Sequence, residues 1–151
     1  MITVGARMPN EEDKKLIRRY YEEVVSTGAV DEVTRFVSPD YVEVHDNKRF
    51  AIGIEGAKEH IRGVRQTYPD LRLTVEQQIA EGEWVVTRVT MRGTHRGEWQ
   101  GIKPTGKPVE VTAVNIDRVV GGRIVEHGGA ANLLGPLLEI GAIRVARGGN
   151  D

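Results

Sequence analysis

The chain of 151 residues contains no cysteine. This absence excludes disulfide bonds, thiol nucleophiles and thiolate-ligated metals. An excess of either charge is also missing, since the formal net charge is −1. A balanced charge gives no bulk attraction to nucleic acid or to an anionic membrane surface, so we expect neither as a partner.

Long hydrophobic runs are absent as well. No apolar stretch reaches the ~20 residues that span a bilayer, and residues 1–10 contain no run of signal-peptide length. We therefore expect a cytoplasmic protein without a membrane partner. The length suits one domain, so we predict a single domain over residues 1–151 with its core at about 11–143.

Motifs for metals, nucleotides and nucleophilic serines are missing too. The glycines between positions 93 and 106 do not have phosphate-binding spacing, and no histidine pair has ligand spacing. Glu126 and His127 are adjacent, so they point to opposite faces of a strand. We expect neither a metal nor another cofactor.

The first half of the chain has helical periodicity. Asn10 is a predicted N-cap of a helix whose apolar residues recur at helical spacing up to Gly28. Asp31 is the predicted cap of a short second helix, and Pro39 ends it. A third helix is predicted over residues 54–68, with an apolar stripe on one side.

The second half alternates between apolar and polar residues, which predicts strands. We expect strands at 71–79, 84–92, 107–120 and 123–131, a shorter one at 41–45, and a short closing helix within 133–143. Helices followed by antiparallel strands favour an α+β fold with the helices on one face of a curved sheet.

The predicted strand at 107–120 has two distinct faces. One carries Asn115 and Asp117 among small apolar residues, which is typical of a pocket lining. The other carries Val114 and Ile116, and we expect a second copy of the chain to cover it.

Two residues are candidates for acid/base chemistry. Asp117 shares a face with Asn115, which suits an acid and the group that orients it; alternatively, Asp117 is a structural carboxylate paired with Arg88 or Arg92. His127 in an apolar cavity suits a general base, or it is a strand histidine bonded to a neighbour.

Further residues are candidates for binding substrate. His45 is expected near the cavity mouth; alternatively, it is a structural histidine. Trp99 caps the pocket or packs under the loop, and Tyr41 belongs to the core or to the cavity wall. Arg88 interrupts an apolar strand, so we expect it to be buried with Asp117 or Glu126, as an ion pair or a substrate clamp. His60 is expected to be solvated, beside Glu59 on a helix.

An ordered series of short motifs identifies a family. They are Asp40-Tyr41, Tyr68-Pro69-Asp70-Leu71, Arg92-Gly-Thr-His95, Gly101-Ile-Lys-Pro-Thr-Gly106, Asn115-Ile-Asp-Arg118 and Gly122-Arg-Ile-Val-Glu126-His127. In this order they resemble the SnoaL-like polyketide cyclases, also called ester cyclases, of the nuclear transport factor two-like superfamily. The resemblance extends from about Leu16 to Gly141.

This resemblance implies a fold and an activity. The fold is a cone-shaped curved antiparallel sheet wrapped around helices and an apolar cavity. Members form dimers or tetramers through the outer face of the sheet. The characterised cyclases close a ring by intramolecular aldol condensation of an aromatic polyketide ester, without a metal or cofactor. The implied partner is thus a small hydrophobic or aromatic substrate.

The sequence departs from the family pattern at two acids. The acid that often follows the Glu-His pair corresponds to Gly129, and a second frequent acid corresponds to Asn132. Asn132 can hold a substrate oxygen but cannot exchange a proton at neutral pH. Three hypotheses follow: a cyclase using Asp117 or His127, an epoxide hydrolase or isomerase on the same scaffold, or a binding module without catalysis.

Overall fold

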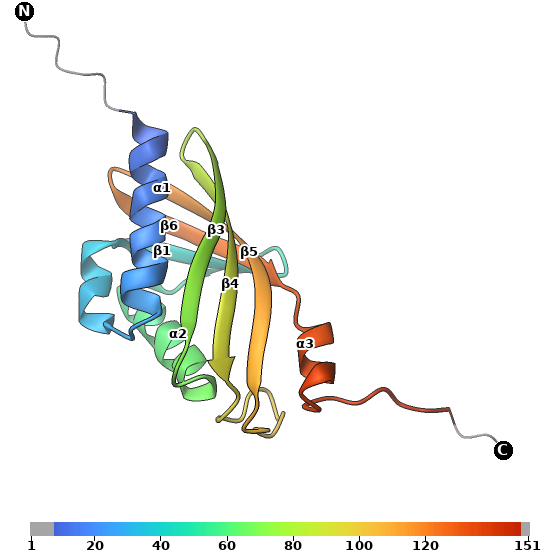
Figure 1. The fold of residues 1–151 in the computed structure, drawn as a ribbon. Helices are drawn as coiled ribbons and strands as arrows, with labels where there is room; N and C mark the ends of the chain where they lie inside the picture. The colour runs from blue at the N-terminus through green and yellow to red at the C-terminus, as the bar shows by residue number, and fades with distance from the viewer. Residues whose placement is uncertain (1–7, 149–151) are drawn as a thin grey trace, which may run out of the picture.

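The computed structural model describes residues 8–148, which form helices and one six-stranded sheet (Figure 1). The elements, in chain order, are α1 (Pro9–Arg19), η1 (Tyr20–Val25), η2 (Val30–Arg35), β1 (Val37–His45), β2 (Lys48–Ala51), α2 (Gly53–Thr67), β3 (Arg72–Glu81), β4 (Trp84–Thr94), β5 (Pro108–Val120), β6 (Arg123–Ala131) and α3 (Leu134–Glu139). No helix among residues 8–148 is both long and apolar enough to cross a membrane.

The first helix begins at Pro9, with Met8 as its cap residue, so the prediction that Asn10 caps it is wrong. Proline suits the first helical position because its ring presets φ and its missing N–H has no partner there. The helix continues as the π-helical segment η1, and the chain turns at Gly28 with φ of +74°. Ala29, not Asp31, is the cap residue of η2.

The strands lie in the order β2-β1-β6-β5-β4-β3. The β3–β6 meander is antiparallel, as predicted, but β1 pairs with β6 in parallel. These two strands are far apart in the chain, so no hairpin constrains their relative direction. The sequence pattern does not indicate β2, because its four residues are all exposed. It follows a turn at Asp46 and Asn47, which both have positive φ.

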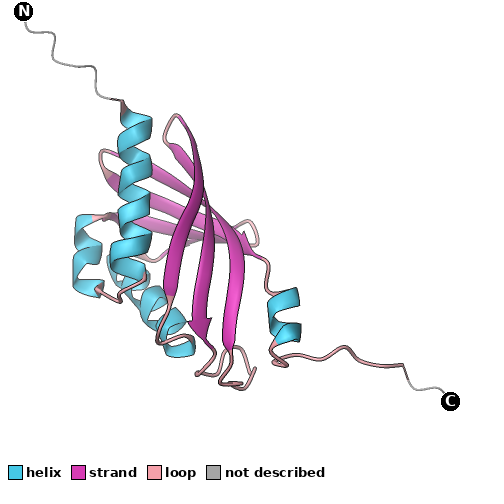
Figure 2. Cartoon of the chain, viewed as in Figure 1, coloured by secondary structure: helices cyan, strands magenta, loops and turns pink. Residues whose placement is uncertain are grey.

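The sheet is twisted and curved, and α1 and α2 lie on its concave side (Figure 2). Buried side chains from the two layers form a core that includes Ile17, Val33, Val85, Val89 and Ile124. A second cluster joins α3 to the end of the sheet and includes Leu71, Val111, Leu137 and Ile140. The α+β fold predicted from the sequence is confirmed.

The two faces of β5 differ in burial as the alternation predicts. Val111 and Asp117, on the concave face, are each 1% exposed, whereas Val114 and Ile116 on the convex face are 42% and 45% exposed. The concave face is therefore where an enclosed site can form.

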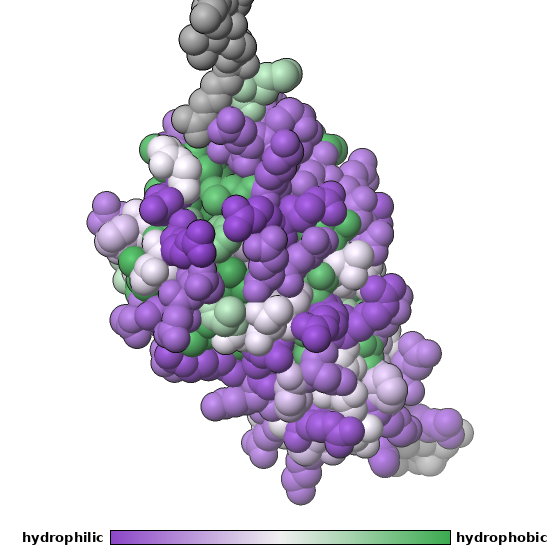
Figure 3. Space-filling model, turned by 60° about the vertical axis from the view of Figure 1, so that its left-hand side comes forward, coloured by the Kyte–Doolittle hydropathy of each residue, from purple (hydrophilic) through white to green (hydrophobic). Residues whose placement is uncertain are grey.

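The surface of the molecule seen from another side is mostly hydrophilic, with apolar side chains visible between the polar ones (Figure 3).

Candidate active site

A cavity of about 340 Å³ lies between the concave face of the sheet, η1 and α2. Its volume is at the lower end of the range typical of small-molecule sites. One part of the wall is apolar and aromatic and includes Leu73, Val89, Met91 and Trp99. The other part is polar and includes Tyr21, Glu43, His45, His60, Asn115 and His127. The cavity therefore suits a ligand with a hydrophobic body and one polar, reactive end.

Asp117 and His127 form the first polar group of the site. They occupy opposed positions on β5 and β6, so both side chains lie on the concave face. His127 Nδ1 is 2.7 Å from Asp117 Oδ1. The side chain of Asp117 is only 1% exposed, whereas that of His127 is 19% exposed and lines the cavity. Asp117 thus lies behind His127 and orients it.

Tyr21 adds a second hydrogen bond to the same carboxylate. Its hydroxyl, on η1, donates to Asp117 Oδ2 and lies 3.5 Å from His127 Nδ1. Burial, followed by the negative charge of Asp117, raises the pKa of Tyr21 well above its ordinary value. The tyrosine therefore keeps its proton, and Asp117 accepts from both Tyr21 and the Nδ1–H of His127.

This arrangement leaves His127 Nε2 available as a base. Nε2 has no hydrogen-bond partner among residues 8–148, and the ring lines the cavity. Burial lowers the pKa of His127, but the charge and hydrogen bond of Asp117, together with the charge of Glu43, outweigh it, so the pKa is raised. A raised pKa makes the neutral imidazole a stronger base.

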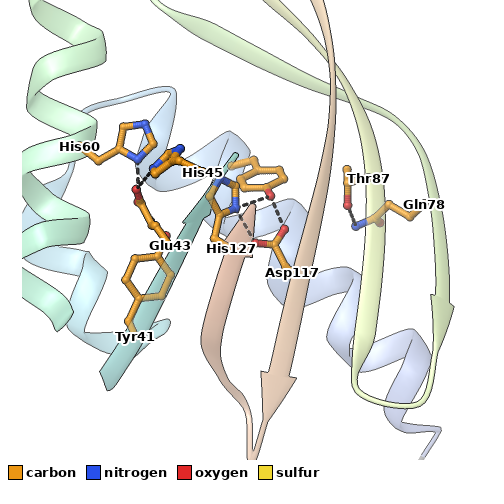
Figure 4. Close-up of polar contacts among 9 residues, drawn as sticks. Tyr41, Glu43, His45, His60, Gln78, Thr87, Asp117 and His127 are labelled. Carbon is orange, nitrogen blue, oxygen red and sulfur yellow. Dashed lines mark hydrogen bonds and ion pairs between the residues drawn. The ribbon is translucent and has the colours of Figure 1, made fainter. Parts of the chain in front are cut away.

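Glu43 is the centre of a second polar group, on β1 (Figure 4). His60 Nδ1, on α2, is 2.7 Å from Glu43 Oε1, and His45 Nε2 is 3.0 Å from Glu43 Oε2. The hydroxyl of Tyr41 donates to Glu43 Oε1 at 3.0 Å. Burial alone would raise the pKa of Glu43, but the hydrogen bonds from His60 and His45 and the charges of the nearby His60 and His127 lower it to about 2. Glu43 is therefore an ionised carboxylate at neutral pH.

The two polar groups approach each other through their histidines. The ring centroids of His60 and His127 are 6.4 Å apart, and both rings line the cavity. Each of these histidines is held through Nδ1 by a carboxylate that is almost fully buried. Two oriented imidazoles thus converge on the polar end of the cavity from different elements of the fold.

Several residues singled out from the sequence line the cavity. They are Asn115, His127, Tyr41, Trp99 and His45, the last with an exposed side chain. Asp117 lies behind His127 and not in the wall itself, and two others lie away from the site. Arg88 is exposed on the convex face of β4, so its predicted burial and its pairing with Asp117 or Glu126 are wrong; Glu126 pairs with Arg49 instead. Asn132 follows β6, is exposed, and is not part of the cavity wall.

Glu43 and Tyr21 are functional residues that no sequence motif predicts, and His60 was predicted only to be solvated. His60 is 42% exposed at its side chain, but it also binds Glu43. A signal for His60 was present, since it follows Ala57 by three residues and precedes Val64 by four, on the apolar stripe of α2. A polar residue on such a stripe faces the interior of the fold.

Gly129 occupies the position where the resemblance implies an acid, and its surroundings leave no room for a side chain. A Cβ atom at this position would lie 2.5 Å from Asn115 Oδ1 and 2.6 Å from the carbonyl oxygen of Val114. Both distances are shorter than any normal carbon–oxygen contact, so a side chain cannot be accommodated without movement of β5. Asn115 and the backbone of β5 occupy the space that an acid at position 129 would need.

Within residues 8–148, no group of three or more histidine, aspartate or glutamate side chains is placed to hold a metal ion. The polar groups can instead exchange protons, because each joins an imidazole to an ionisable carboxylate. A curved sheet with helices on its concave side and a cavity lined by such groups defines a class of small α+β proteins with an internal cavity large enough for a small molecule.

Comparison with known proteins places the chain within that class. The model of the SnoaL-like polyketide cyclase family matches residues 15–140, so the chain belongs to this family. Nogalonic acid methyl ester cyclase from Streptomyces nogalater is 27% identical over 118 residues, covering 77% of this chain and 88% of that protein.

Solved structures show the same fold. IdmH from Streptomyces antibioticus superimposes with a TM-score of 0.73 at 29% identity, covering 85% of this chain and 98% of its own. A SnoaL-like protein from Jannaschia sp. CCS1 gives a TM-score of 0.78 at 25% identity, covering 91% and 98%. The family resemblance inferred from the motifs is confirmed.

Proposed function

We propose that the chain catalyses an intramolecular aldol cyclisation of an aromatic polyketide ester without a cofactor, with His127 as the general base. The observation that carries this proposal is the buried Asp117 carboxylate, which binds Nδ1 of the cavity-lining His127 and so leaves Nε2 to meet a substrate. The related proteins from Streptomyces nogalater and Streptomyces galilaeus are named as methyl ester cyclases, which supports the same reaction class.

The reaction requires one proton to leave carbon and one to reach oxygen. His127 Nε2 removes a proton from a carbon that lies between two carbonyl groups, and the resulting enolate is stabilised by conjugation. The enolate carbon attacks a ketone carbon of the same molecule, so a C–C bond forms and the C=O π bond breaks. Protonation of the alkoxide gives a hydroxyl group. The product is an isomer of the substrate.

The cavity also supports the substrate class. Met91, Trp99 and Tyr68 lie in the apolar part of the wall, where they can contact a fused aromatic body. Asn115 lies in the polar part and offers an amide to a carbonyl oxygen. This division orients the reactive end of a hydrophobic ester towards His127.

A direct assay tests the proposal. The purified protein is incubated with aromatic polyketide methyl esters, including nogalonic and aklanonic acid methyl esters, and products are separated by chromatography and mass. We expect a new product with the mass of its substrate, and a loss of ~10²–10⁴-fold in rate for His127→Gln. If the wild-type protein converts none of the esters, or if His127→Gln keeps the full rate, the proposal is wrong.

The competing hypotheses receive less support. Opening of an epoxide would need an arginine beside the acids of the site, but Arg88 lies on the opposite face of the sheet. A module that only binds would be expected to have a wall of apolar groups and amides. The cavity instead contains two connected networks with titratable groups, which favours catalysis.

We also propose that a second copy of the chain covers the convex face of the sheet. Ile79, Val86 and Ile116 form a cross-strand row there, and Ile79 is 61% exposed. Two ion pairs lie on the same face: Arg118 with Glu83, and Arg92 with Glu110. An apolar row bordered by both charges can pair with its own two-fold image, which supports a homodimer.

A further inference from the structure

The proposed reaction needs a proton donor for the alkoxide, and the site offers few. The hydroxyl protons of Tyr21 and Tyr41 are already donated to Asp117 and Glu43. Tyr20 also lines the cavity, but burial, followed by the charges of Asp117 and Glu43, raises its pKa. Loss of a tyrosine proton would place a new anion beside two carboxylates, which is electrostatically unfavourable.

An imidazolium avoids this cost because it becomes neutral when it donates. Glu43 accepts hydrogen bonds from both His60 and His45. Hydrogen bonds between a cationic donor and a carboxylate are stronger than those between neutral groups. His60 is the better placed of the two. Its ring centroid is 6.4 Å from that of His127, whereas His45 has a 57% exposed side chain at the rim.

We propose that His60, held by Glu43, is the general acid that protonates the substrate oxygen while His127 removes the proton from carbon. This assignment rests on the proposed function, because it divides the two proton transfers of the aldol reaction between two histidines. The separation of the two rings is close to the span of two successive hydrogen bonds of ~3 Å, so both can reach neighbouring atoms of one substrate.

The proton balance is complete. His127 Nε2 gains the proton lost from carbon, and His60 Nε2 gives its proton to the new alkoxide oxygen. The net result is one proton moved from His60 to His127. Both side chains are partly exposed, at 42% and 19%, so solvent can restore their starting states between turnovers.

The two proton transfers can be measured separately. In D₂O, enolate formation exchanges the acidic C–H of the ester for deuterium, and mass spectrometry measures this exchange above the buffer rate. We expect His60→Gln to lower cyclisation by ~10²-fold or more while exchange stays within a few-fold of wild type. His127→Gln should lose both. Glu59→Gln is the matched control, because Glu59 is an exposed neighbour on the same helix.

The outcomes separate the roles. If His60→Gln loses exchange and cyclisation equally, or keeps both, His60 is not the acid. If Tyr20→Phe instead separates exchange from cyclisation, the donor is Tyr20 and the assignment is overturned. Thermal unfolding of each variant is measured alongside, so that loss of folding is not mistaken for loss of a proton donor.

A second measurement does not depend on turnover. 4-Nitrophenolate imitates the alkoxide oxyanion, and its binding is followed by its absorbance. We expect His60→Gln to bind it ~10-fold more weakly than Glu59→Gln does. Equal binding would overturn the assignment even if cyclisation were lost. If wild-type protein cyclised no ester but bound the phenolate through His60, the aldol function and the acid role within it would be wrong, and His60 would be supported only as a group that binds an oxyanion.

Discussion

His127 Nδ1 lies 2.7 Å from Asp117 Oδ1, across a pair of directly opposed residues on β5 and β6. The carboxylate is buried and the imidazole reaches the cavity, so the charge of Asp117 acts on the base without touching the substrate. Its removal should therefore change the pH dependence of the reaction as well as its rate.

We predict that the acidic limb of kcat/KM in the wild-type protein has its midpoint above pH 6.5, the ordinary value for histidine. A general base must be neutral in order to accept a proton. Because the pKa of His127 is raised, a higher pH is needed to deprotonate it. Asp117→Asn removes the largest influence that raises this pKa, so the limb should move to lower pH while the maximal rate falls. A pH–rate profile of both proteins checks this; an unchanged midpoint would contradict it.

The same pair affects stability with a defined sign. The folded-state pKa of His127 is above its unfolded value, so the pair stabilises the fold fully below the unfolded pKa, and this contribution is lost as pH rises through the folded pKa. The difference in unfolding free energy between wild type and Asp117→Asn should therefore shrink as pH rises above about 6.5. Urea denaturation at several pH values measures that difference.

Glu43 should affect stability at acidic pH in the opposite direction. Its pKa is lowered from 4.5 to about 2, so its contribution to stability is present above pH 4.5 and is lost as pH falls towards 2. We predict that Glu43→Gln loses less stability than wild type over this interval. The measurement is acid unfolding followed by circular dichroism, and parallel curves for the two proteins would contradict the prediction.

The sequence was sufficient to predict the faces of β5. Its apolar and polar residues alternate strictly, and the concave face of a half-buried strand follows from that alternation. The same alternation placed the side chains of Asp117 and His127 on the concave face of the sheet. Their direct contact depends on the β5–β6 register, which the sequence did not fix.

Arg88 shows where the alternation of apolar and polar residues does not predict the face of a strand. Apolar residues occupy both faces of β4 around it, with Val85 and Val89 on one side and Val86 on the other. Because the surroundings looked apolar, the arginine was assigned to the interior. Arg88 lies on the convex face, where the side chains of the neighbouring strands are also exposed and do not cover it.

The second polar group could not be assembled from the sequence. Glu43 reaches the cavity because β1 pairs in parallel with β6, and His60 reaches it from α2. No local pattern predicts a strand pairing between segments about eighty residues apart. Only the position of His60 on the apolar stripe of α2 was readable in advance.

The convex face offers a test of self-association. We predict that Ile116→Lys converts a dimer of wild-type protein into a monomer, because a lysine in the apolar row would be buried in the interface without a partner. Gln66→Lys on α2 is the matched control, since it adds the same charge at an exposed position away from this face. Analytical ultracentrifugation measures the mass of each protein. A monomeric wild-type protein, or a dimeric Ile116→Lys variant, would contradict the proposed interface.

Position 129 tests whether the missing family acid can be restored. A Cβ atom there would lie 2.6 Å from the carbonyl oxygen of Val114, which belongs to the backbone and cannot rotate away. We therefore predict that both Gly129→Ala and Gly129→Asp destabilise the fold by about 1–3 kcal/mol, the usual range for overpacking.

Comparison of the two variants separates the steric effect of a side chain at position 129 from the effect of its charge. Similar losses for alanine and aspartate would show that the close approach to β5 is the cause, and neither should increase the rate of cyclisation. Gly63→Ala is the control, since a Cβ there meets no atom within 4 Å and alanine favours the helix. If Gly129→Asp were as stable as wild type and cyclised faster, the acid/base work would belong at position 129 and not to His127.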